Sequence, residues 1–198
     1  MHDPGQLNKR QDALRTEAGE VLGRLTLIED IGPGLMTGSY VSRLMTWPEL
    51  DMMVLVGPDF TPEDVLGLMA RLVGLPGVVG LDYADERGLR CPTEHRRDER
   101  FHVGVKIEHG ATTWSVDLSL WLHDLHTNVT EWHDRLRDTI TPEQREAVLW
   151  IKDVWHRRPE YPAEVGGLDV YTAVCEGGVR TPAEFAGWLS ERGHPGWL

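Results

Sequence analysis

The chain has 198 residues, 40% of them hydrophobic, and its 32 acidic residues against 20 Lys and Arg give a formal net charge of −12. This composition predicts a folded globular protein rather than a disordered one, with one large domain or two small ones. The charge excludes a long nucleic acid as the expected main partner, although a divalent cation in an acidic cleft can still attract a small phosphorylated ligand.

The sequence contains no targeting or membrane segment that we can recognise. The N-terminus lacks an apolar signal core, and nowhere do about 18 uncharged apolar residues run together. Cys91 and Cys175 belong to no CxxC pair, so free thiols are expected rather than a disulfide framework. We therefore expect a cytoplasmic protein that does not bind a membrane.

The first part of the chain alternates between helical and strand patterns. Apolar residues recur at helical spacing over 6–29, and 34–39 is typical of a short strand entering a turn. The apolar run 50–56 has strand length, and a helix start precedes the pattern of 62–74. With a strand expected at 78–84, these segments form a β-α-β pattern.

The second part changes from strands to helices. The highly charged segment 85–100 predicts an exposed loop, and two strands are expected on either side of the turn His109-Gly110. Four helices are then expected, at 127–138, 142–156, 168–176 and 182–191. We predict a mixed α/β (α+β) fold, in which 1–124 form the core and 125–198 a helical subdomain.

Three acidic residues stand out within the predicted strands. Glu49 and Asp51 are two residues apart, so their side chains point to the same face of a strand. Two adjacent carboxylates repel one another unless a cation lies between them, and Mg²⁺ is the natural ion for oxygen ligands. Asp117 stands in the apolar strand WSVDLSL. If its strand neighbours that of Asp51, three carboxylates converge, enough to hold two divalent ions.

The order of these residues resembles the signature of the nucleotidyltransferase superfamily typified by DNA polymerase beta. The turn Gly38-Ser39 is followed after nine residues by Glu49-Leu50-Asp51-Met52, and later by Val116-Asp117-Leu118. The resemblance covers roughly residues 10–122, and the helical remainder is similar to the cap of small antibiotic nucleotidyltransferases. It depends on the order and spacing of these short motifs, because each of them alone is weak.

The resemblance implies roles for particular residues. Metal would be bound by Glu49, Asp51 and Asp117, and Asp117 could also take the proton of the acceptor hydroxyl. Contacts to the nucleoside triphosphate, ATP in the first instance, would come from Gly38, Ser39 and Lys152, and Arg43 could serve the triphosphate in place of the family's usual residues. Tyr171 could stack on a base or line the acceptor pocket. For Lys152 the competing interpretation is a surface lysine at the edge of an apolar helix face, and Tyr171 could instead be a core residue.

The sequence also departs from the family pattern. Glu49 stands where Asp is commoner, and the family's second Gly after the Gly-Ser turn is missing, so that Arg43 is left as the basic residue of this turn. The leading hypothesis is an Mg²⁺-dependent enzyme that transfers a nucleoside monophosphate from an NTP to a hydroxyl of a small molecule or protein. The runner-up is a catalytically inactive member of the fold that acts in binding or regulation.

Two further hypotheses come from aromatic and histidine residues. A partner-binding protein, for example a homodimer, would expose an aromatic face on the helical part. The nine histidines also suggest a zinc site as a hypothesis. His123 and His126 are three residues apart and could supply two ligands, but no third ligand follows at a diagnostic spacing. We therefore favour solvated or core histidines over a histidine metal site.

Overall fold

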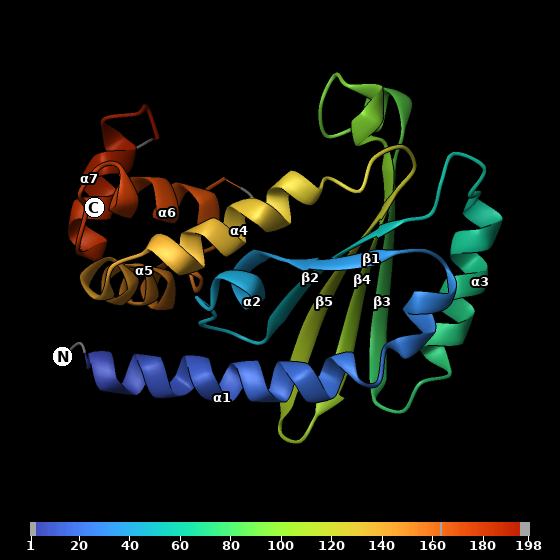
Figure 1. Cartoon of the computed structure of the whole chain (residues 1–198), viewed down its shortest axis with the longest axis horizontal. Helices are drawn as coiled ribbons and strands as arrows, with labels where there is room; N and C mark the ends of the chain where they lie inside the picture. Colours follow the sequence, from blue (N-terminus) through green and yellow to red (C-terminus); the bar gives the residue numbers. More distant parts are fainter. Residues whose placement is uncertain (1–2, 163, 195–198) are drawn as a thin grey trace.

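A five-stranded mixed sheet forms the centre of the molecule (Figure 1). The computed structural model describes residues 3–162 and 164–194. The strands are β1 (Gly34–Thr37), β2 (Glu49–Leu55), β3 (Val78–Glu86), β4 (Arg100–His109) and β5 (Thr112–Trp121), in the spatial order β1-β2-β5-β4-β3. β2 and β5 are parallel, and the other neighbouring pairs are antiparallel. The predicted mixed α/β fold is thus confirmed.

Helices precede, interrupt and follow the sheet strands. They are α1 (Pro4–Leu22), α2 (Gly38–Ser42), α3 (Pro62–Val73), α4 (Thr127–Thr139), α5 (Pro142–Trp155), α6 (Gly167–Cys175) and α7 (Pro182–Ser190). Short 3-10 turns lie at η1 (Thr26–Asp30), η2 (Gly88–Arg90) and η3 (Arg96–Asp98). Thr61, Thr141 and Thr181 cap α3, α5 and α7 through capping boxes followed by Pro, as the sequence predicts.

The first helix is shorter than predicted. It ends at Leu22, and the rest of the expected helix 6–29 is a turn followed by η1. Gly23 has low helix propensity and its backbone amide already closes the last turn of α1, so apolar spacing alone extended the prediction too far.

The two faces of the sheet differ in character. Leu50, Val54, Val116 and Leu118 lie on one face, where they join α1 and α3 in an apolar core. Because side chains alternate along a strand, the residues between them, including Asp51, lie on the opposite face. In Figure 1, α1 and α3 leave this second face free for the segments that follow β5.

A second apolar core holds the C-terminal helices together. Val148, Ile151 and Phe185 are fully buried in it, and Leu44 from the end of α2 and Leu7 from the start of α1 pack into it as well. α1 also carries Leu14 into the sheet core. The helical part is therefore joined to the α/β part through α1 and α2 rather than through one linker near residue 124.

Two of the sequence hypotheses concern the helices and the exposed surface. No helix among the described residues is long and apolar enough to cross a membrane. Within that part of the chain, the large exposed hydrophobic residues include one aromatic side chain, Tyr83, and it lies on β3. The exposed aromatic face that would favour the partner-binding hypothesis is not found on the helices described.

Candidate functional site

The three predicted acids come together on the polar face of the sheet. β2 and β5 are neighbours, as required, and Asp51 stands directly opposite Asp117 in their register. Neighbouring strands are about 4.8 Å apart, and Glu49 follows two residues away on the same face. The parallel pairing of β2 with β5 therefore places three half-buried carboxylates side by side.

These acids line a cavity of about 650 Å³ between the sheet and the C-terminal helices. Of the residues predicted to bind metal or nucleotide, seven line it: Gly38, Ser39, Glu49, Asp51, Asp117, Lys152 and Tyr171. Further walls come from α4 and α6, so the helical part closes the cavity over the end of the sheet. A volume of this size is typical of a small-molecule or cofactor site.

Gly38 is required by the position of Asp51. Its φ is +64°, in the left-handed region, and a Cβ added there would lie 2.0 Å from Oδ2 of Asp51. A residue with a side chain would thus be strained and would also collide with the carboxylate. The Gly-Ser turn and the acid strand are consequently in direct contact, which the sequence spacing alone does not show.

Burial of the acid pair disfavours its charge. Burial, together with the charges of Asp51 and Asp117, raises the pKa of Glu49 to about 7. Burial and the charge of Asp117 together raise the pKa of Asp51 to about 6. Lys152 opposes both shifts. The cavity therefore gains from any further positive charge placed among these carboxylates.

Lys152 is a buried residue of the cavity, not a surface lysine. Its side chain is only 2% exposed, and Nζ donates to the backbone oxygen of Leu44 at 2.9 Å and to the hydroxyl of Tyr171 at 3.2 Å. Nζ also lies 4.9 Å from the centre of the Trp47 ring. The interpretation of Lys152 as a surface residue is wrong, because the side of α5 that carries Lys152 packs against α6 and the residues after α2. The apolar periodicity of α5 alone could not reveal this packing.

Arg43 does not join the other predicted residues. It is exposed at the end of α2, with φ +57°, and its backbone oxygen accepts a hydrogen bond from Arg145 at 2.6 Å. It does not line the cavity. The five-residue helix α2 separates Arg43 from Gly38, and Arg43 lies at its far end. The sequence interpretation, which placed both residues in one turn, missed this helix.

Several cavity residues were not predicted from the sequence. Trp47 stacks on His156 at 4.9 Å between ring centroids, and Tyr161 meets its edge at 5.2 Å. The ring centroids of His133 and Trp132 are 4.9 Å apart. Burial, together with the charge of Lys152, lowers the pKa of His133 to about 4, so its ring is neutral at pH 7. Nδ1 of His133 is buried without a hydrogen-bond partner.

One of these residues carried a signal that could have been used. Trp47 precedes the acid pair by two residues, on the side from which the strand enters the sheet, and it donates a side-chain hydrogen bond to Glu49. The other aromatic residues are brought in by α4 and by the segment before α6. Their helical spacing equally fits a core position, so no local pattern marks them as cavity residues.

The carboxylates offer oxygen ligands suited to a hard cation. Among the described residues, no three His, Cys, Asp or Glu side chains are grouped tightly enough to hold a metal ion by themselves. Mg²⁺ in phosphate-transferring sites is commonly held by one or two carboxylates together with the substrate phosphates. The neighbouring pair Asp51 and Asp117 meets that requirement, and the orphaned buried hydroxyl of Thr37 faces the same cavity.

No protein-family model and no curated protein matches the chain. Among solved structures it is similar to a cytoplasmic RNA terminal U-transferase, with 14% identity and a TM-score of 0.43. It is also similar to the Cid1 poly(U) polymerase bound to MgATP, with 13% identity and a TM-score of 0.48. A third is the non-canonical poly(A) polymerase GLD-2 in complex with GLD-3, with 10% identity and a TM-score of 0.49.

The matches cover 75%, 73% and 89% of this chain but only 39%, 42% and 55% of those proteins, respectively. The chain therefore spans about half of the length of these proteins or less. Two of them are named for polymer products, whereas the sequence predicts a small-molecule or protein acceptor. The chemistry of this chain must therefore be inferred from its own cavity.

Proposed function

We propose that this protein is an Mg²⁺-dependent nucleotidyltransferase that transfers a nucleoside monophosphate from an NTP, ATP in the first instance, to a hydroxyl acceptor. The observation that carries the proposal is the gathering of Glu49, Asp51 and Asp117 on one sheet face, beside a buried lysine and an aromatic-lined cavity. We retain the cytoplasm as its expected location.

In this proposal the nucleotide occupies the 650 Å³ cavity. Gly38 and Ser39 border its phosphates, and Lys152 supplies a fixed positive charge behind them. Trp132 and Tyr171, whose ring centroids are 5.8 Å apart, present aromatic surface to the base. The buried lysine is held by two hydrogen bonds before a ligand arrives, so its orientation costs little on binding.

The transfer itself is an in-line displacement at the α-phosphorus. The acceptor oxygen forms a bond to that phosphorus, the bond to the pyrophosphate oxygen breaks, and the proton of the hydroxyl passes to the carboxylate of Asp117. Bound Mg²⁺, held by Asp51 and Asp117 with Glu49 two residues away, would neutralise charge on the phosphates and the leaving pyrophosphate. A second ion, if bound, would take its remaining ligands from the substrate phosphates.

A non-catalytic nucleotide-binding role is the second candidate. It is favoured by the outward position of Arg43, which leaves the Gly-Ser turn without its expected basic residue. It also fits Glu49 in place of the commoner Asp. Both candidates predict that Mg-nucleotide binds in the cavity, and they differ in whether pyrophosphate is released.

Calorimetric titration with each Mg-nucleotide tests the shared prediction. Wild type should bind at least one of them saturably and only with Mg²⁺, and Asp51→Asn should lose this binding. Asp82→Asn is the matched control, because Asp82 is an exposed acid in the same cross-strand row, on β3 opposite Gly104. Absence of binding to every nucleotide, or equal affinity in wild type and Asp51→Asn, would refute the site. Pyrophosphate release with candidate acceptors then separates enzyme from binding protein.

A further inference from the structure

A second cavity of about 450 Å³ lies on the other side of the acid pair. It shares Thr37, Asp51, Asp117, Asn128 and Val129 with the nucleotide cavity, so the two spaces meet between the carboxylates and the start of α4. A hydroxyl reaching the acids from this side would approach an α-phosphate held on the opposite side. We name this space the acceptor cavity.

The floor of the acceptor cavity is the polar face of the sheet. Asp117, Ser119 and Trp121 follow one another on that face of β5, and His102 stands opposite Ser119 on β4. Nε2 of His102 is 4.0 Å from Oδ1 of Asp117. Four residues of strand span about 13 Å, so the cavity extends roughly that far from the acids to the Trp121 end.

The far end of the acceptor cavity carries guanidinium groups. Arg100, opposite Trp121, lies with its guanidinium carbon 5.0 Å from the centre of the Trp121 ring, and it also bonds Glu86 at 2.5 Å and Ser119 at 2.8 Å. Arg97 touches Asp98 through Nε at 3.4 Å, and its side chain is 61% exposed. Arg97 also lines the acceptor cavity, with Nε rather than a terminal amino group nearest to Asp98.

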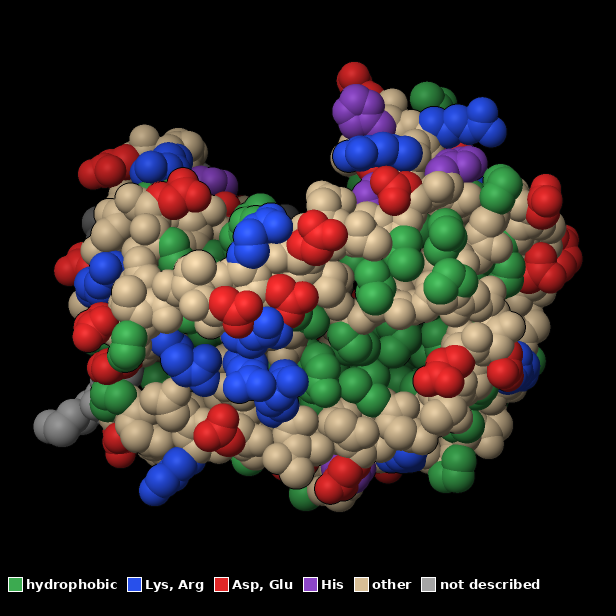
Figure 2. All heavy atoms as spheres, in the orientation of Figure 1, with side chains coloured by type: hydrophobic (Ala, Val, Ile, Leu, Met, Phe, Trp, Pro, Cys, Tyr) green, Lys and Arg blue, Asp and Glu red, His purple; other side chains and the backbone are tan. Residues whose placement is uncertain are grey.

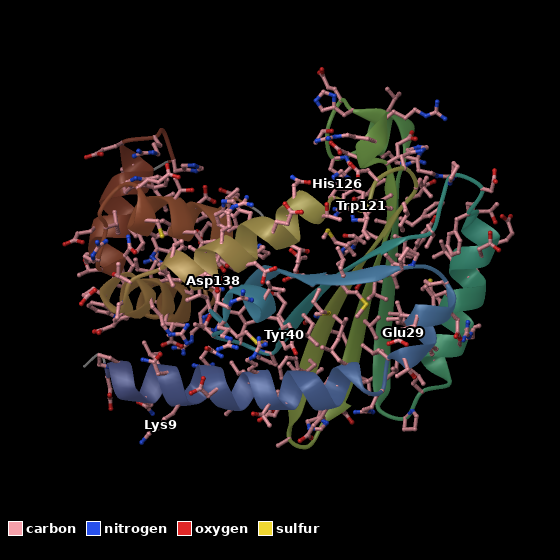
Figure 3. All side chains as sticks on the ribbon, viewed as in Figure 1. Lys9, Glu29, Tyr40, Trp121, His126 and Asp138 are labelled. Carbon is pink, nitrogen blue, oxygen red and sulfur yellow. The ribbon has the colours of Figure 1, made fainter. Side chains whose placement is uncertain are left out.

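The segment 87–99 is fixed as the wall that presents Arg97. Asp98 is buried, accepts a hydrogen bond from Thr93 that lowers its pKa, and lies 3.4 Å from Nε2 of His126. His126 is itself buried against Trp121, with 4.3 Å between ring centroids. In Figure 3, His126 and Trp121 lie together below this segment, and Figure 2 shows the surface hollowed between it and the helical part. The carboxylate of Asp98 thus lies between the ring of His126 and the guanidinium of Arg97.

We propose that the acceptor is a small molecule with a hydroxyl at one end and a phosphate at the other, the phosphate being bound by Arg97 with support from Arg100. This deepens the proposed function and rests on it. The length of the cavity is sufficient for a sugar phosphate or a molecule of similar size. A bidentate guanidinium is well suited to a phosphate. A long polyanion is disfavoured by the net charge of −12.

Inorganic phosphate is the probe for this site. It is titrated calorimetrically into the full chain in the presence of Mg²⁺ and a saturating non-hydrolysable ATP analogue, which fills the nucleotide cavity, and again without the analogue. Wild type should bind phosphate saturably, and Arg97→Gln should weaken the affinity about tenfold. Arg96→Gln is the matched control: Arg96 has the same charge in the same segment, is 84% exposed, and does not line the acceptor cavity.

Each outcome decides the proposal. Absence of saturable phosphate binding, or equal affinity in wild type and Arg97→Gln, would overturn it. Binding of the analogue without phosphate would do so while leaving the proposed function intact. If the analogue does not bind, the titration without it still shows whether Arg97 holds an anion. A hexameric oligoadenylate that binds through Arg97 more tightly than phosphate would identify an RNA end as the acceptor and overturn the small-molecule proposal.

Discussion

Replacement of Gly38 by Ala tests how closely the Gly-Ser turn and the acid strand depend on each other. The substitution has two separate costs. A left-handed backbone at φ +64° costs an L-residue roughly 1–2 kcal/mol of stability. The new Cβ would also lie 2.0 Å from Asp51 Oδ2, where real contacts are not below 3.0 Å, so the carboxylate must move by about 1 Å.

The matched control is Gly110→Ala, in the β4–β5 hairpin. Gly110 has φ +60°, and a Cβ there would meet nothing within 4 Å, so it has the backbone cost without the collision. Both variants should lose about 1–2 kcal/mol of unfolding free energy, measured by denaturant titration. Only Gly38→Ala should also lose Mg-nucleotide affinity, by about tenfold or more, because the carboxylate that we propose to bind the metal is displaced.

The two measurements separate strain from site geometry. A displacement of about 1 Å at a reacting group is expected to slow transfer by roughly 100-fold as well. If Gly38→Ala and Gly110→Ala bind Mg-nucleotide equally, Asp51 can be moved without consequence. It would then not be a metal ligand, and the role assigned to the acid strand would be wrong.

Three further predictions concern the charges around the cavity. The pKa of Glu49 is about 7 in the folded state and 4.5 when unperturbed, so its bound proton stabilises the metal-free folded protein at low pH. As the pH rises from 5 to 8, the free energy of unfolding should therefore fall relative to that of Glu49→Gln, by at most about 1.4 kcal/mol per pH unit. A constant difference between the unfolding free energies of the two proteins at every pH would contradict this. Lys152→Met should unfold about 1–3 kcal/mol more easily, because the carbonyl of Leu44 loses its donor, whereas the exposed Lys9→Met should change stability by less than about 0.5 kcal/mol. Imidazole NMR signals of His133 should not titrate above pH 5, and a midpoint near 6.5 would show that the ring is solvated.

The strand-borne part of the site could be predicted because it follows from alternation and order. The two-residue spacing of Glu49 and Asp51 fixes their common face, and Asp117 is marked as the one charged residue of a largely apolar strand. Only the adjacency of β2 and β5 had to be supplied by the structure. The starts of α3, α5 and α7 were equally local, since each of these three is a Thr-Pro sequence.

The remaining features depend on how distant segments pack. Whether Lys152 is exposed depends on α2 and α6 covering α5, and no residue near Lys152 records this. The direction of Arg43 depends on the length of α2 and on Arg145, which holds its carbonyl oxygen. The segment 85–100 was predicted as an exposed loop, and the structure adds that it is a wall of the acceptor cavity. Such information is non-local, so sequence periodicity cannot supply it.

Helix α1 has a mechanical consequence for ligand entry. Its 19 residues make a rod about 28 Å long, with Leu7 anchored among the C-terminal helices and Leu14 anchored under the sheet. Arg10 also forms a salt bridge to Asp153 on α5, with 2.7 Å between Nη1 and Oδ1. The two lobes that border the nucleotide cavity cannot swing apart as on a hinge without bending this rod or pulling an anchor out. Ligands should therefore diffuse into a preformed cavity, and the rates of binding and release should not be limited by a movement of the two lobes.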